Sequence, residues 1–91
     1  MPVQQTTLLN LMHPEQIETL IADHISCEFL QVLSDDNTHF ESTIVTSAFD
    51  GKSRIQRHRL VYAALGNHME SDIHALSMKL YTPEEYKALN E

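Results

Sequence analysis

Cysteine, glycine, proline and positive charge are all scarce in this 91-residue chain. The single cysteine, Cys27, cannot form a disulfide within the chain, which is typical of a reducing compartment. Two glycines and three prolines leave no room for a long flexible linker. No segment approaches the roughly 20 consecutive apolar residues that span a bilayer. The sequence therefore indicates one domain that does not enter membranes, and we expect it in the cytoplasm.

The first twelve residues also lack the marks of a targeting signal. They have neither a basic start nor a long apolar run, so we expect no secretory signal. They show no clear hydrophobic period, and we expect a flexible tail over residues 1–12 and a single domain over residues 13–91. The chain as a whole is 42% hydrophobic and 21% charged, which is typical of a folded protein.

Positive charge is both rare and unevenly placed. Six lysines and arginines against thirteen acids give a net charge of −7, whereas DNA-binding proteins usually have a basic balance or a broad basic face. Residues 52–59, here called the basic segment, carry Lys52, Arg54, Arg57, His58 and Arg59. Because cations near a helix N-terminus oppose the helix dipole, another group should compensate them. The candidates are an acidic partner, nucleic-acid phosphate and the chain's own acids.

The first half of the chain predicts a helix and a hairpin. Pro14 suits the first position of a helix, and apolar residues recur after it at a helical spacing. These residues are Ile17, Leu20, Ile21 and Ile25. Residues 28–33 and 39–46 are rich in strand formers and flank the turn residues SDDNT. Two strands around a short polar loop predict a β-hairpin.

A turn at residues 49–51 precedes the next helical region. One continuous helix from this turn would place the charge of Arg57 in its apolar stripe. We therefore expect a break near residues 55–58, followed by a main helix from His58 to about residue 69. Tyr62 of that helix is expected in the core.

The chain closes with a strand and a helix. Residues 73–81 alternate in polarity and predict a third strand. Thr82, Pro83 and Glu85 form a strong helix start, because the threonine can cap and the glutamate completes a capping box. The order α-β-β-α-α-β-α predicts a small α/β sandwich, with a three-stranded sheet and helices on one face. A crossover that joins parallel strands should be right-handed.

Four motifs carry a resemblance to a known family. They are the turn FDG at 49–51, the run RHRLVY at 57–62, the segment IHALS at 73–77 and the helix start TPEEY at 82–86. Together they resemble the BolA-like proteins over about residues 14–88. The loop ending in HF at residues 39–40 resembles the shorter bacterial BolA-like subgroup. The resemblance implies an α/β fold like the type II KH domain.

The resemblance also implies a partner and a cofactor. BolA-like proteins pair with monothiol glutaredoxins, and the two chains can share a bridging [2Fe–2S] cluster. By this resemblance, His74 of the IHALS motif and His39 of the hairpin would be ligands, while the glutaredoxin cysteine and glutathione supply the rest. The isolated protein is then expected to hold no cofactor and to be a monomer or weak dimer. The family also includes transcription regulators of cell shape and stress response.

Two positions depart from the patterns of related folds. The nucleic-acid clamp of KH domains needs a GxxG loop, since glycine lets the backbone approach phosphates closely. Residues 51–54 read GKSR and have only the first glycine, which argues against nucleic-acid binding of the KH kind. Cys27 precedes the first strand instead of lying in the hairpin loop, so no ligand role is carried over to it.

Each candidate residue has a plainer alternative. His74 could be a partly buried strand residue held by a hydrogen bond, and His39 an exposed loop residue or a partner of Asp35 or Asp36. The basic segment could be a solvated helix start that pairs with the chain's own acids. The sequence shows no nucleophile–base pair, phosphate-binding glycine loop or zinc-spaced Cys–His cluster, so we expect no enzyme.

Two functional hypotheses follow. The leading one is an iron–sulfur trafficking adaptor that shares a labile cluster through His74 and His39, while the basic segment orients an acidic or glutathione-bearing partner. The alternative is a nucleic-acid-binding transcriptional regulator that uses residues 52–59, and it predicts binding that weakens steeply with salt. The sequence leaves open whether the two histidines converge.

Overall fold

The computed structural model describes residues 12–71, 73 and 75–90 of the chain. None of the helices in this part is long and apolar enough to cross a membrane. Met12, which we assigned to the tail, is 8% exposed and packs in the core. The packed part therefore includes Met12, one residue before the expected boundary, and residues 1–11 of the expected tail lie outside the described residues.

Helix α2 spans Pro14–His24 and confirms the first expected helix. Pro14 occupies its first turn, where a missing N–H is no loss, and Gln16 Oε1 accepts the N–H of His13 at 2.7 Å. The helical spacing points Ile17 and Ile21 into the core, and both are fully buried.

The sheet contains three strands in the order β1-β2-β3. β1 (Phe29–Leu33) and β2 (His39–Val45) form the expected antiparallel hairpin. β3 (Ala75–Tyr81) pairs with β2 in parallel, in a register that runs from His39 opposite Ala75 to Val45 opposite Tyr81. Because parallel strands need a long crossover connection, the helices between β2 and β3 must carry the chain back along the sheet.

Helix α3 spans Arg54–Leu65 without interruption, so the expected break near residues 55–58 is wrong. Ser53 caps the helix: its Oγ accepts the N–H of Gln56 at 3.2 Å, and Gln56 Oε1 accepts the N–H of Ser53 at 2.8 Å. The helix continues through Arg57 because other groups pair that charge.

The helical region breaks instead after α3, at Gly66 and Asn67. Gly66 has a φ of 62°, which glycine adopts without steric cost, and its N–H donates to the Tyr62 carbonyl at 3.0 Å. The short helix α4 (His68–Ser71) follows. Tyr62 is 43% exposed, so its expected place in the core is wrong. Its ring meets the ring of His58 edge-on, with centroids 6.3 Å apart.

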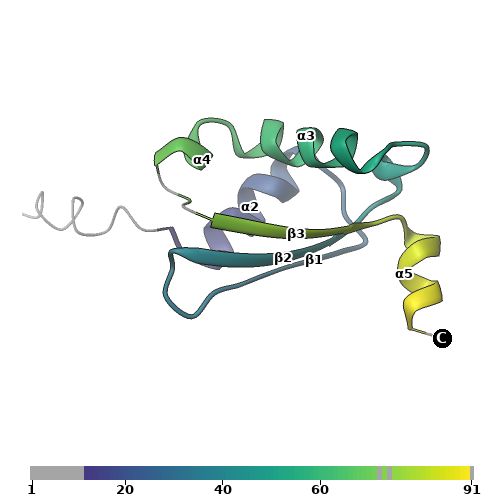
Figure 1. The fold of residues 1–91 in the computed structure, drawn as a ribbon, viewed down its shortest axis with the longest axis horizontal. Helices are drawn as coiled ribbons and strands as arrows, with labels where there is room; N and C mark the ends of the chain where they lie inside the picture. The colour runs from purple at the N-terminus through teal and green to yellow at the C-terminus, as the bar shows by residue number, and fades with distance from the viewer. Residues whose placement is uncertain (1–11, 72, 74, 91) are drawn as a thin grey trace, which may run out of the picture.

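The core lies between the sheet and helices α2 and α3, which cover the same face (Figure 1). Because side chains alternate along β2, every second one is buried against these helices. The apolar stripe of α3 packs against these buried side chains. The short 3-10 turn η1 (Ser47–Phe49) contributes an aromatic ring. The large side chains that are at most 2% exposed in this core are Ile17, Ile21, Phe40, Ile44, Phe49, Val61, Leu65 and Ile73.

Helix α5 (Pro83–Leu89) lies beyond the end of β3 and is directed to the side away from α2 and α3 (Figure 1). The strand register aligns Phe29, Val45 and Tyr81 across this end of the sheet. The ring of Tyr86 from α5 stacks on Phe29 with centroids 5.6 Å apart and meets Tyr81 at 5.7 Å. This aromatic row explains why Val45 is only 2% exposed on the face away from α2 and α3.

Candidate functional site

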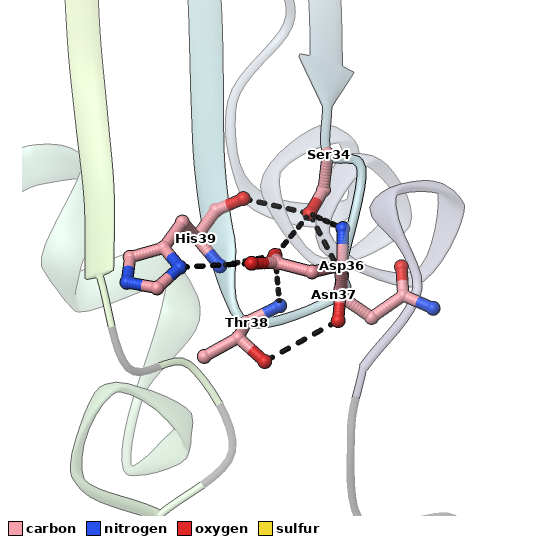
Figure 2. A network of polar contacts seen from close by, with 5 residues as sticks. All are labelled: Ser34, Asp36, Asn37, Thr38 and His39. Carbon is pink, nitrogen blue, oxygen red and sulfur yellow. Dashed lines mark hydrogen bonds and ion pairs between the residues drawn. The ribbon is translucent and has the colours of Figure 1, made fainter.

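The hairpin loop is organised by the side chain of Asp36 (Figure 2). Asp36 Oδ1 accepts the backbone N–H groups of Thr38 and His39, both at 2.9 Å. Ser34 holds the loop from the other side, because its Oγ donates to the His39 carbonyl at 2.6 Å and accepts the N–H of Asn37 at 2.9 Å. The turn-rich sequence thus becomes a hydrogen-bonded frame that ends at the first residue of β2.

His39 stands at the end of this frame with its side chain 73% exposed. Its ring Nδ1 lies 3.0 Å from Oδ2 of Asp36, and Nε2 lies on the far side of the ring from the carboxylate (Figure 2). Hydrogen bonds from the N–H and ring of His39, and then from the N–H of Thr38, hold the pKa of Asp36 well below its usual range. The structure confirms that His39 is a partner of Asp36, and this contact engages Nδ1 and not Nε2.

An open hollow of about 490 Å³ lies beside the ring of His39, lined by residues of the hairpin and the beginning of β3. The register puts Ala75 directly opposite His39, and the N–H of Ala75 donates to the Thr38 carbonyl at 3.3 Å. His74 precedes Ala75 in the sequence and lies outside the described residues. The convergence of the two histidines stays a prediction.

Cys27 does not join this site. Its half-buried thiol donates to the Ile25 carbonyl at 3.4 Å. Burial, followed by the negative charge of Glu28, raises the pKa of the thiol. Since the thiolate is the metal-binding form, this environment disfavours ligation. Within the described residues, no group of three or more His, Cys, Asp or Glu side chains could hold a metal ion.

A second open hollow, of about 770 Å³, lies at the other end of the sheet, between the start of α3 and the end of β3. We call it the basic hollow. Members of the basic segment line it together with one cation from β3: Lys52, Arg54, Arg57, His58 and Lys79. Arg59 does not line it. Lys52, Arg54 and Lys79 are exposed, and none of them forms an ion pair within the part of the chain that the structure describes.

Arg57 differs from the other cations because its side chain is only 13% exposed. Its two terminal nitrogens donate to the Glu85 carboxylate at 2.7 and 3.2 Å, and one of them also donates to the Leu80 carbonyl at 3.2 Å. Nε donates to the Lys52 carbonyl at 3.0 Å, and the guanidinium lies over the Phe49 ring, 5.6 Å from its centroid. Arg57 therefore ties α3 to α5. For this residue the structure supports pairing with one of the chain's own acids, which was the alternative to contact with a partner or nucleic acid.

Sequence reasoning missed one residue of these sites and left the role of another open. Asp36 was one of two candidate partners of His39, and it has a local signal, since an aspartate often accepts backbone N–H groups two or three residues ahead in a turn. Lys79 has no local signal in the sequence. It lines the basic hollow only because the fold brings β3, paired with β2, close to the start of α3.

A family model of BolA-like proteins matches residues 13–85. The chain belongs to the BolA-like family. The DNA-binding transcriptional regulator BolA of Vibrio cholerae is 32% identical over 89 residues, covering 88% of this chain and 84% of that protein. The regulator of the same name from Haemophilus influenzae is 43% identical over 54 residues, which cover 59% of this chain and 52% of that protein.

Solved structures of the family agree with the fold. The crystal structure of a Bol-like protein from Babesia bovis superposes with a TM-score of 0.77 at 34% identity, covering 89% of this chain and 96% of that one. The expected class, with helices on a three-stranded mixed sheet, is therefore confirmed.

Replacing Arg57 with alanine should destabilise this BolA-like protein. The substitution removes hydrogen bonds to a carboxylate and to two carbonyls, so we expect the free energy of unfolding to fall by about 2 kcal/mol. Arg54→Ala is the matched control, because Arg54 is exposed and unpaired in the described part, and it should change stability by less than about 0.5 kcal/mol. Urea titrations measure both values, and equal losses would contradict the structural role of Arg57.

Stability should also fall in acid through Glu85. Hydrogen bonds from Arg57, followed by the N–H of Thr82, lower the pKa of Glu85 from 4.5 to about 2. A carboxyl group whose pKa is lower in the folded state stabilises that state at higher pH, and this contribution is lost as pH falls from 4.5 to about 2. Across that window the unfolding free energy should drop more in the wild type than in Glu85→Gln. The neighbouring variant Glu84→Gln should follow the wild type, and three parallel curves would contradict the assignment.

Proposed function

We propose that this BolA-like protein is an iron–sulfur trafficking adaptor that binds a monothiol glutaredoxin and shares a labile [2Fe–2S] cluster with it. Its role is shared coordination and not catalysis. His39 and His74 would be the ligands from this chain, while the glutaredoxin cysteine and glutathione supply the others. We further propose that it acts in the cytoplasm and is a monomer or weak dimer when free.

The observation that carries this proposal is the position of His39. The ring is exposed at the rim of an open hollow, and its Nε2 points away from the loop that holds it (Figure 2). The parallel register puts His39 opposite Ala75, which directly follows His74 in the chain. This pairing supports a site to which both segments contribute.

The chemistry of the donors fits a cluster held between two chains. A neutral imidazole nitrogen is a competent iron ligand, and histidine in place of cysteine raises the reduction potential of a [2Fe–2S] centre. His39 offers such a nitrogen at the surface, whereas the thiol of Cys27 is engaged with Ile25. Thiolate ligands would therefore come from the partner. A partner that retains its own ligands can carry the cluster away, which favours transfer over storage.

The basic hollow supports contact with an acidic partner. Lys52, Arg54 and Lys79 present three cations on a chain whose net charge is −7, so their position orients the approach of a negatively charged surface. Such exposed charges contribute more to the rate and direction of association than to its final affinity. Acidic side chains of the glutaredoxin are the groups we expect there, because glutathione that ligates the cluster would lie with His39 at the other end of the sheet.

The same cations favour a second candidate function, the binding of nucleic acid. The related Vibrio cholerae protein is named as a DNA-binding transcriptional regulator. Against this function stand the net charge of −7 and the missing second glycine of residues 51–54. If both functions exist, a protein partner in the basic hollow would compete with DNA.

The cluster hypothesis predicts a spectrum that depends on two histidines. Wild-type protein mixed with a monothiol glutaredoxin, glutathione, iron and sulfide should give visible absorption and circular dichroism distinct from those of the glutaredoxin homodimer. His39→Ala and His74→Ala should change this spectrum and speed cluster loss at least about tenfold, because each removes a ligand. His24→Ala is the control, since His24 bonds the Leu20 carbonyl on α2 and lines neither hollow.

A mixture that shows only the glutaredoxin homodimer would contradict the adaptor function. If both histidine variants gave an unchanged heterodimer spectrum, the proposed partner would stand, but His39 and His74 would not be cluster ligands.

The nucleic-acid hypothesis predicts a particular salt dependence. Three exposed cations at the basic hollow would give a slope of about −2.7 for log K against log salt concentration on duplex DNA. The double variant Lys52→Ala, Arg54→Ala should reduce this slope by about 2, because two phosphate contacts are lost. Lys87→Ala removes an exposed cation of α5 that does not line the hollow, and it should leave the slope unchanged. Fluorescence anisotropy measures these slopes, and a flat response in the wild type would contradict DNA binding.

A further inference from the structure

The contact between Asp36 and His39 determines where the proton of the ring lies. An ionised carboxylate has no hydrogen to donate and can only accept hydrogen bonds. Oδ2 of Asp36 lies 3.0 Å from Nδ1 of His39, so the proton of this contact belongs to Nδ1. A neutral ring carries one N–H, which leaves Nε2 unprotonated with its lone pair directed away from Asp36 (Figure 2).

The carboxylate of Asp36 is itself held in place. Oδ1 accepts the N–H groups of Thr38 and His39, both at 2.9 Å, so the two oxygens have separate tasks. Oδ1 fixes the carboxylate to the backbone of the loop, while Oδ2 is presented to the ring. The ring and the backbone N–H that bind Asp36 belong to the same residue, which limits how far the two side chains can drift apart.

We infer that Asp36 is a positioning residue for the ligand histidine: it holds His39 in the tautomer that presents an unprotonated Nε2 to a metal. Histidine ligands in metalloproteins commonly donate their other ring N–H to a carboxylate, which fixes the tautomer and ring orientation. This inference rests on the proposed ligand role of His39. It assigns to the acidic hairpin loop a task that neither its turn chemistry nor its exposure requires.

An asparagine at position 36 would reverse the arrangement with almost no change in shape. Its Oδ1 can still accept the N–H groups of Thr38 and His39, and its NH₂ then faces Nδ1 of the ring. Because that amide nitrogen can only donate, Nδ1 must accept and the proton moves to Nε2. Asp36→Asn therefore removes the lone pair needed for ligation while keeping the loop bonds.

The matched control is Asp35→Asn, the same change at the adjacent acid. Asp35 lines the same hollow and has the same charge, but it makes no hydrogen bond to His39. A second control, Ser34→Ala, removes the hydroxyl bonds to the His39 carbonyl, the Asn37 N–H and, at 3.3 Å, Oδ1 of Asp36, but it removes no bond to Oδ2 or to the ring. An effect of loop disruption or of net charge would appear in these controls, whereas an effect on the ring would not.

The first experiment measures the tautomer in the free protein. Long-range ¹H–¹⁵N correlation spectra distinguish protonated from unprotonated ring nitrogens, and His39→Ala assigns the signals. In spectra recorded in alkaline solution with the ring neutral, the wild type, Asp35→Asn and Ser34→Ala should show the proton on Nδ1. Asp36→Asn should show it on Nε2. A wild-type ring protonated on Nε2, or no change in Asp36→Asn, would overturn the inference.

The second experiment tests the consequence for the cluster. In the mixture with a monothiol glutaredoxin, glutathione, iron and sulfide, Asp36→Asn should lower cluster retention by about 10- to 100-fold relative to Asp35→Asn. Equal retention would overturn the positioning role and leave the adaptor function intact. Failure of the wild type to form a shared cluster would overturn the adaptor function, and the spectra of the free protein would still decide whether Asp36 sets the tautomer.

Discussion

The parallel pairing of β2 with β3 is the constraint on which the rest of the structure depends. Two parallel neighbours cannot be joined by a tight turn, so α3 must return the chain to the start of β2. The apolar stripe of α3 then packs on the same sheet face as α2 and completes the core. The same register puts the beginnings of the two strands together at His39 and their ends together at Tyr81.

Each of these two ends is held by one carboxylate with a double role. Asp36 binds two backbone N–H groups of its own loop and the ring of His39. Glu85 binds the backbone N–H of Thr82 at the start of α5 and the guanidinium of Arg57. In both cases a short helix start or turn fixes the acid, and the acid then fixes a cationic or titratable side chain. One end of the sheet thus carries the acidic hairpin loop, which presents the imidazole of His39. The other end carries the basic hollow, where Arg57 binds Glu85 of α5.

The sequence predicted the elements whose signals are local. The hairpin followed from the turn residues 34–38, and the start of α5 followed from Thr82 and Glu85. The failure at residues 55–58 is instructive, because the projection correctly placed Arg57 beside the buried stripe and wrongly concluded that the helix must break. A largely buried guanidinium is tolerated when its donors are satisfied, and the partner Glu85 lies 28 residues away in the sequence.

The candidate sites show the same contrast between local sequence signals and contacts of residues distant in the sequence. His39 was found through family resemblance, but its partner among two neighbouring acids was fixed only by loop geometry. Lys79 joined the basic hollow through strand register, and Tyr62 stayed outside the core because the helical phase of α3 runs unbroken from Ser53. Sequence patterns therefore suggest candidate residues but do not show which of them meet, since meeting depends on contacts between distant segments.

If His39 is a cluster ligand, as we propose, its exposure has a physical consequence for how this protein would handle the cluster. A structural metal site surrounds its ion with a full set of ligands from one chain and thereby stabilises the fold. The fold described here is already closed by its core and by the ion pair of Arg57 with Glu85, and the exposed ring of His39 belongs to neither. Binding a cluster at such a residue would add little to folding, so nearly all of the interaction free energy can go into holding the partner. A ligand that is oriented in advance and unnecessary for folding is therefore suited to reversible sharing.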